Sequence, residues 1–197
     1  MNPSSVMIVV LVVAVIAIAA IAFGISRKHR SQKLREHFGP EYDRVVKREG
    51  DVRKGEGVLE FREKRHHKFE IRPLSSTDRS SFLYRWNDVQ SRFVDDPKSA
   101  VTQADSLVTD AMQARGYPMG DFEQRAADVS VDHPHVVTNY RAARETAERN
   151  KSGKATTEDL RQAMVHYRSL FEELLETSTT TAQPRTTESL PRKEAAR

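Results

Sequence analysis

The sequence of 197 residues predicts an all-α protein with an N-terminal transmembrane helix, a helical stalk, a small helical bundle and a disordered C-terminal tail. One stretch near the N-terminus is continuously apolar, and the segments after residue 74 carry apolar residues at helical spacing. No segment alternates with a period of two for long enough to form a strand. The four predicted units cover residues 1–26, 27–74, 75–176 and 177–197.

The apolar stretch runs from Val6 to Ile25 and holds no charged residue. Its 20 residues, at about 1.5 Å each, match the thickness of a bilayer's hydrocarbon core, about 30 Å. Its 13 Val, Ile, Leu and Phe side chains favour insertion by about 4 to 8 kcal/mol. A secretory signal peptide would carry Lys or Arg before this stretch, and none is present, so we expect an uncleaved anchor.

Basic residues crowd the C-terminal flank of this stretch, at positions Arg27, Lys28, Arg30, Lys33 and Arg35. Because positive flanks stay on the cytoplasmic side, the C-terminal domain is predicted to be cytoplasmic. Each cation beside an anionic leaflet contributes about 1 kcal/mol of attraction. We therefore expect these five side chains to contact lipid headgroups.

The excess of positive charge is confined to the membrane-proximal region. Residues 27–70 hold 14 basic and 9 acidic side chains, whereas residues 71–176 hold 14 and 17. Because the second region is slightly acidic, the sequence argues against nucleic acid as a partner. The absence of cysteine excludes a fold stapled by disulfides or held by cysteine-ligated metal.

The region of residues 27–74 contains one apolar column with a spacing of seven, formed by Phe38, Val45, Val52, Leu59 and His66. Charged residues lie between them, as on the flanks of a coiled coil. The second apolar column of a coiled coil is missing, and Gly50, Gly55 and Gly57 each cost a helix about 1 kcal/mol. We expect a basic, mostly solvated helical stalk, with a self-associating coiled coil as the alternative.

Residues 75–176 predict five helices with apolar stripes. The first carries Phe82, Trp86, Val89 and Phe93 on one face, which places the only tryptophan in the core. Start and stop signals separate the helices: Asp96 with Pro97, Gly116, Asp121 with Gln124, Pro134, Asn150 to Gly153, and Thr156 with Asp159.

The last 21 residues, 177–197, are rich in Thr, Ser and Pro and contain one large apolar residue, Leu190. Such a segment buries too little apolar surface to offset its ordering entropy, so we expect a disordered tail. A passive solubilising role is favoured over a phosphorylated one.

Candidate chemistry is sparse. Asp132, His133 and His135 could contribute metal ligands, but the two histidines flank Pro134 and point in different directions, and Asp132 or His133 as a helix N-cap explains the same residues. Signatures of hydrolases and nucleotide-binding loops are absent from the sequence. The sequence assigns no catalytic, cofactor-binding or metal residue and favours a non-enzymatic role.

One loop has the composition of a contact surface. Tyr117, Met119 and Phe122 lie between and beside two glycines, and an aromatic ring with a flexible Met is typical of interfaces. These three residues are the candidate partner surface. The alternative is that Tyr117 closes the end of the bundle as a core residue.

The strings FVDDP, ADSLV, ARGYP, DFEQRAADVSVDHP and TEDLRQAMVHYRSLFEELLE carry a resemblance to known sequences. With them, roughly residues 36–176 resemble a widespread family of uncharacterised bacterial proteins that often begin with a membrane-spanning or signal-like segment. The resemblance implies a protein of the bacterial membrane or envelope and supplies no activity. Members are often labelled secreted, which is opposite to the orientation that the flanking charges predict.

The expected function is a single-pass interaction or scaffolding module at the cytoplasmic face of the bacterial inner membrane. Its partner would be another protein or a second copy, and no cofactor is expected. The alternative is a membrane-tethered domain that binds a small ligand or acts as an enzyme. Its pocket would be lined by aromatic side chains, namely Trp86, Tyr117, Tyr140 and Tyr167.

Overall fold

The computed structural model describes residues 3–176, including their side chains except those of residues 3–10, 12–14 and 17. This part of the chain forms eight helices and no strand, so the all-α prediction is confirmed. The helices are α1 (Pro3–Phe38), α2 (Pro40–Glu49), α3 (Val52–His66), α4 (Ser76–Arg92), α5 (Pro97–Arg115), α6 (Phe122–Asp132), α7 (Val137–Lys151) and α8 (Thr157–Glu176). The predicted tail, residues 177–197, lies outside the described residues.

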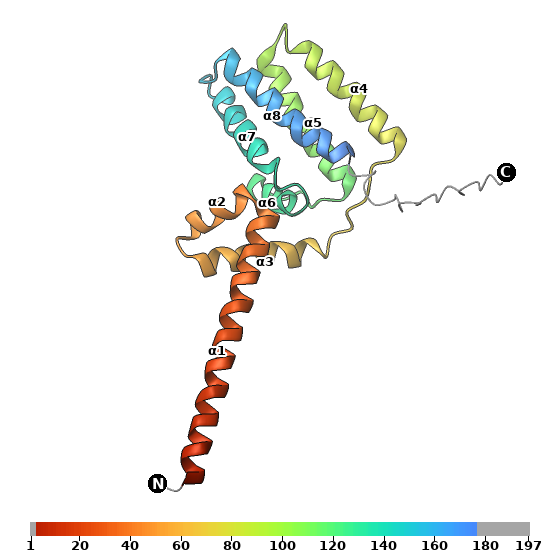
Figure 1. The fold of residues 1–197 in the computed structure, drawn as a ribbon. Helices are drawn as coiled ribbons and strands as arrows, with labels where there is room; N and C mark the ends of the chain where they lie inside the picture. Colours follow the sequence, from red (N-terminus) through yellow and green to blue (C-terminus); the bar gives the residue numbers. More distant parts are fainter. Residues whose placement is uncertain (1–2, 177–197) are drawn as a thin grey trace, which may run out of the picture.

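Figure 1 shows α1 as a long helix whose N-terminal half projects away from a helical body. Helices α2 and α3 turn back beside the C-terminal end of α1, and α4, α5, α7 and α8 form a bundle on the far side. The short helix α6 lies between the two parts and packs against α1, α3 and α7.

The main core fills the space between the four bundle helices. Helix α8 packs against both α5 and α7, and α4 covers α5. The ring of Trp86 stacks on Phe171 with 4.7 Å between ring centroids, and Tyr140 meets Tyr167 edge to face. The apolar stripe predicted for α4 is confirmed, because Phe82, Trp86 and Val89 are all buried.

Most of the predicted helix starts are confirmed by cap hydrogen bonds. Ser75, Asp96 and Asp121 each accept a bond from the backbone amide three residues later, as N-caps do. Thr156 and Asp159 form a reciprocal pair, in which each side chain accepts from the other residue's backbone amide.

The start of α7 differs from the prediction. The helix begins at Val137, not at Pro134, and the residue before it supplies no side-chain cap. The backbone amides of Val136 and Val137 donate instead to the carbonyl of His133. The N-cap interpretation of Asp132 or His133 was therefore wrong, because both side chains are engaged elsewhere.

The predicted solvated stalk is corrected by the structure. Residues 27–74 do not form one helix, because Gly39 and Gly50 adopt positive φ angles of 49° and 69° and turn the chain twice. Helices α2 and α3 then pair with each other and with the end of α1 around a small core of Leu34, Phe38, Tyr42, Val45 and Leu59. Phe38, Val45 and Leu59 of the column with a spacing of seven lie in this core, whereas Val52 is exposed, so the column is not the seam of a coiled coil. We call α2 and α3 the hairpin.

The hairpin depends on one close backbone approach. A Cβ atom placed on Gly55 would lie 2.9 Å from the Cα atom of Val46, closer than real side chains tolerate. Glycine at this position therefore lets α2 and α3 approach each other, which offsets its cost to the helix. Gly57, two residues later, faces open space instead.

Judged on the side chains that the structure describes, no helix has an apolar stretch long enough to cross a membrane. The segment Val6–Ile25, predicted to be an anchor, includes nine residues outside that set, namely residues 6–10, 12–14 and 17. The anchor therefore stays a prediction.

The packing of Trp86 yields a stability prediction. Replacing Trp86 by Ala should lower the free energy of unfolding by about 3 to 5 kcal/mol, because a buried ring stacked on Phe171 leaves a cavity. Tyr84 on the same helix is 77% exposed, so Tyr84→Ala should change it by less than about 0.5 kcal/mol. Chemical unfolding followed by circular dichroism measures both. Equal effects of the two substitutions would contradict the assignment of Trp86 to the core.

Candidate functional site

The projecting part of α1 exposes an unusual amount of apolar surface. Seven large apolar side chains there are each more than half exposed, namely Leu11, Val15, Ile16, Ile18, Ile21, Phe23 and Ile25. Successive helix positions are about 100° apart, so these side chains cover about 220° of the helix circumference, and the remaining arc carries the exposed Ala20 and Gly24. No single face of α1 is therefore reserved for packing against the body.

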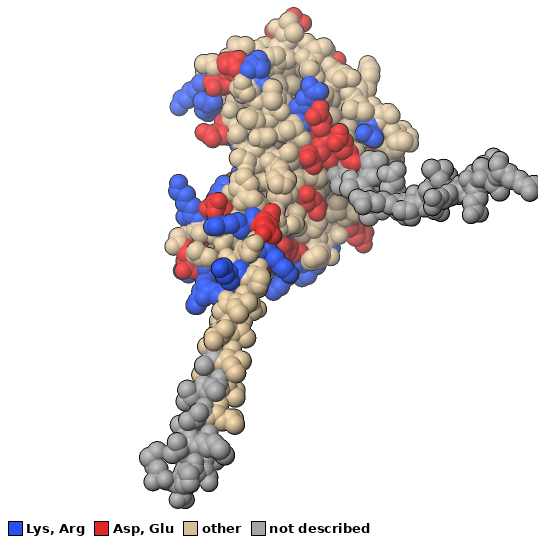
Figure 2. Space-filling view, viewed as in Figure 1, with Lys and Arg blue, Asp and Glu red and all other residues tan. Residues whose placement is uncertain are grey.

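A group of basic side chains lies where α1 enters the body. Arg27, Lys28, Arg30, Lys33 and Arg35 follow directly after the apolar part, and Arg53 of α3 joins Arg27 and Arg30 around one groove. We call these six residues the basic collar. Figure 2 shows Lys and Arg side chains gathered on the side of the body from which α1 leaves.

Sequence reasoning found the five collar residues on α1 and missed Arg53. That residue lies 15 positions after the end of α1 and reaches the collar because the hairpin folds back. The available signals were Gly39-Pro40 and Gly50-Asp51, two pairs typical of turns. The regular spacing of seven favoured a continuous helical stalk over two turns at these pairs.

The members of the basic collar differ in their partners. Arg30 forms an ion pair with Glu60 of α3, and Arg35 lies 3.4 Å from the carboxylate of Asp43. Within the described residues, neither Arg27 nor Arg53 has an acidic side chain at ion-pair distance. Two guanidinium groups of the basic collar thus have no ion-pair partner among the described residues.

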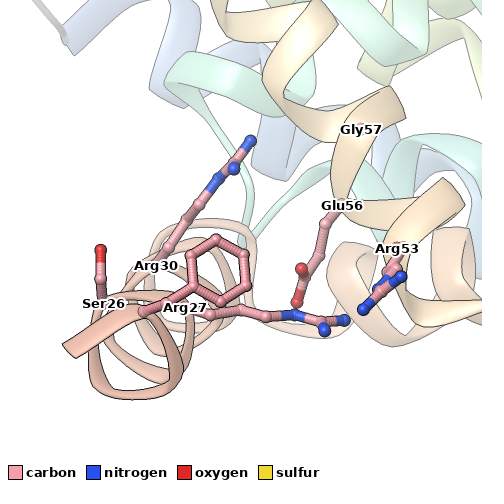
Figure 3. A pocket seen from close by; sticks show the side chains of 7 residues that line it. Ser26, Arg27, Arg30, Arg53, Glu56 and Gly57 are labelled. Carbon is pink, nitrogen blue, oxygen red and sulfur yellow. The ribbon is translucent and has the colours of Figure 1, made fainter. Parts of the chain in front are cut away.

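A groove of about 370 Å³ separates α1 from α3 at this level. Figure 3 shows Arg27 extending below Glu56 toward Arg53, with Arg30 turned away from both. The carboxylate of Glu56 is nearly buried and accepts a 2.9 Å hydrogen bond from the Tyr42 hydroxyl. Burial raises the pKa of that hydroxyl, which keeps it protonated as a donor to Glu56.

The hairpin is joined to the bundle by a buried charge network. The side chain of Glu41 on α2 is fully buried and accepts bonds from Arg62 of α3 at 2.8 Å and from Arg141 of α7 at 3.1 Å. Arg62 also donates to the hydroxyl of Ser130 on α6. Burial lowers the pKa of Arg62, although the adjacent Glu41 carboxylate opposes that shift. We call Glu41, Arg62 and Arg141 the Glu41 network.

A second set of polar contacts joins α3 to α6. Arg65 lies 3.3 Å from Asp128, and Asp132 interacts with His66 at 2.7 Å and accepts a 2.5 Å bond from the Tyr117 hydroxyl. Burial alone would raise the pKa of Asp132, but the bonds from His66 and Tyr117 outweigh it, so the pKa is lowered. Charged groups therefore carry much of the contact between hairpin and bundle.

The candidate partner surface is not brought together by the structure. Tyr117 is buried and held by Asp132, which matches the alternative that it closes the bundle. Phe122 packs against the ring of Tyr140 with 5.0 Å between centroids, and Met119 alone is exposed.

The proposed ligand and metal sites also lack support. The four aromatic residues suggested for a pocket, Trp86, Tyr117, Tyr140 and Tyr167, are each at most 5% exposed and belong to the main core. Among the described residues, no group of three or more His, Cys, Asp or Glu side chains is placed to hold a metal ion. His133 points inward and lies 3.1 Å from Glu173.

Comparison with known proteins adds no family: no family model, no curated protein and no solved structure matches this chain. The resemblance to a bacterial family therefore stays a prediction.

The Glu41 network yields a second stability prediction. Glu41→Ala should lower the free energy of unfolding by about 3 to 5 kcal/mol, because two buried guanidinium groups lose their shared carboxylate. Asp43 lies on the same helix and is exposed, so Asp43→Ala should cost less than about 1 kcal/mol. Urea unfolding of the full chain in detergent compares the two. A loss below 1 kcal/mol for Glu41→Ala would show that the network contributes little.

The buried imidazole of His133 predicts a pH dependence. Burial lowers its pKa from the ordinary value of about 6.5, so the unfolded chain takes up a proton first as the pH falls. Stability due to this group is complete above about pH 7 and decreases as the pH falls below about 6.5. Unfolding free energies measured between about pH 7.5 and 5 should therefore decline, and His133→Gln should flatten the decline. His67→Gln, at an exposed position, should not. Identical slopes for wild type and His133→Gln would contradict the prediction.

Proposed function

We propose that this protein is a single-pass inner-membrane protein whose helical body serves as an interaction or scaffolding module on the cytoplasmic side. The observation that carries the proposal is the arrangement of α1. Its N-terminal half projects from the body, exposes large apolar side chains over most of its circumference, and is followed by the basic collar.

The apolar surface of α1 supports the membrane assignment. Seven large apolar side chains on a solitary helix would leave an extended apolar surface in water, which promotes aggregation. A hydrocarbon environment removes that cost, and the helix satisfies its own backbone hydrogen bonds there. The sequence from Val6 to Ile25 has the length and composition that such a span requires.

The basic collar supports the orientation. Its cations lie at the end of the apolar segment, where anionic headgroups would meet them. The positive-inside rule then places the body in the cytoplasm. The bacterial origin comes from the resemblance of residues 36–176 alone.

The body itself favours binding through its surface. Its aromatic residues fill the core, which gives no support to a small-ligand or enzymatic domain lined by them. Apolar side chains remain exposed on and just after α4, at Leu83, Tyr84 and Val94. Another protein or a second copy of the chain is the partner class that suits such a surface.

Two fusions of the full chain test the proposal. A phosphatase that folds only outside the cytoplasm, fused after Glu176, should be inactive, whereas a fluorescent protein that matures only in the cytoplasm should fluoresce at the same junction. Both fusions should remain in the membrane pellet after an alkaline wash, because insertion by α1 resists such extraction.

Two results would contradict it. An active phosphatase with a dark fluorescent protein would place the body outside the cytoplasm, as the secreted label of the resembled family implies. Recovery of both fusions in the soluble fraction would show that α1 is not an anchor.

A further inference from the structure

We propose that the groove between α1 and α3 binds the phosphodiester group of a membrane phospholipid, held between Arg27 and Arg53. The proposal rests on the proposed function, since the lipid is available only if α1 enters a bilayer. It differs from general attraction of the basic collar to a charged leaflet, because it requires a shaped site for one lipid molecule.

Two guanidinium groups that lack an ion-pair partner among the described residues converge on the groove. Arg27 extends from α1 and Arg53 from α3 into the same groove; Arg27 passes below Glu56, and Arg53 lies beside it (Figure 3). The third arginine of the groove, Arg30, is paired with Glu60. Like charges that face each other across a groove repel, and an anion between them replaces repulsion by two charge-assisted hydrogen bonds.

The charged side chains at the groove leave a small positive excess. Three arginines contribute three positive charges, and Glu56 and Glu60 offset two of them. One positive charge remains. A phosphodiester carries one negative charge, so its binding brings the net charge of the site to zero.

An apolar wall borders the groove. Phe23 is 71% exposed and lies one helical turn before Arg27, on the side of the groove toward the apolar part of α1. A phospholipid in the groove would place its phosphate between the arginines and its acyl chains beside Phe23. A free phosphate ion has no apolar part that could contact Phe23, so the apolar wall favours a lipid as the ligand.

Gly57 has no side chain to fill the groove. This residue lines the groove, and a Cβ atom added to it would meet nothing within 4 Å. Glycine is a poor helix former, so its presence here weakens α3 while it leaves the groove open. A leucine at this position would narrow the groove and leave its net charge unchanged.

The test uses the full chain reconstituted into vesicles of phosphatidylcholine and phosphatidylglycerol at four to one. After extraction into mild detergent and a delipidating wash, native mass spectrometry counts the phospholipid retained per chain. Wild type should retain one phospholipid molecule, chiefly phosphatidylglycerol, because the choline cation of phosphatidylcholine would cancel the negative charge that the two arginines require. Arg53→Gln should reduce the retained fraction about tenfold, the loss expected when one charge-assisted hydrogen bond is removed.

Two further variants separate a site from a charged surface. Gly57→Leu keeps the net charge and should reduce retention as much as Arg53→Gln does, while its helical circular dichroism stays unchanged. Lys54→Gln removes the same charge from the neighbouring exposed position, which does not line the groove, and should retain lipid like wild type.

Three outcomes would overturn the proposal. Equal losses in Arg53→Gln and Lys54→Gln, with Gly57→Leu like wild type, would indicate general electrostatic attraction only. Displacement of the lipid by about 10 mM inorganic phosphate would indicate a site for the free anion. A chain that never enters the vesicle fraction is detected before any lipid is counted, and this result would overturn the proposed function itself.

Discussion

The carboxylate of Glu41 is shared by Arg62 and Arg141 inside the contact between hairpin and bundle, and the arrangement of the body depends on this pairing. A buried carboxylate costs several kcal/mol unless cations and hydrogen bonds compensate for lost water. Arg62 lies on α3 and Arg141 on α7, which are far apart in the sequence. Docking of the hairpin and pairing of Glu41 must therefore occur together, because neither part alone supplies all three side chains.

This coupling determines where the basic collar lies. The small core of the hairpin contains only five buried apolar residues, too few to hold two helices together independently. The Glu41 network and the contacts of Asp128 and Asp132 add the bundle as a support. As a result, α3 is held against α1, and Arg53 reaches the basic collar. The body is therefore packed onto the end of α1 and is not separated from it by a solvated stalk.

The sequence predicted α4 to α8 well because their signals are local: caps such as Asp96 and Thr156 act over three residues, and apolar stripes repeat within each helix. It did not predict the hairpin, since Arg62 and Arg141, the partners that tie Glu41 to α3 and α7, lie 21 and 100 residues away and leave no local pattern. For Tyr117, the surrounding glycines were compatible with both a surface and a core position, and the bond of its hydroxyl to the distant Asp132 fixes it in the core. The apolar length and the basic flank of α1 could be predicted directly from the sequence. The groove could not, because it forms only when α3 folds back and brings Arg53 beside α1.

The central claim is that the body lies against the bilayer with α3 beside the headgroups. The chain contains no cysteine, so a single Lys54→Cys or Tyr84→Cys substitution allows one spin label at an exposed position of α3 or of α4. Electron paramagnetic resonance with a lipid-bound relaxation agent then measures the proximity of each label to the headgroups. We predict strong relaxation at position 54 and none above the aqueous background at position 84. Equal, weak relaxation at both positions would contradict a body held against the membrane.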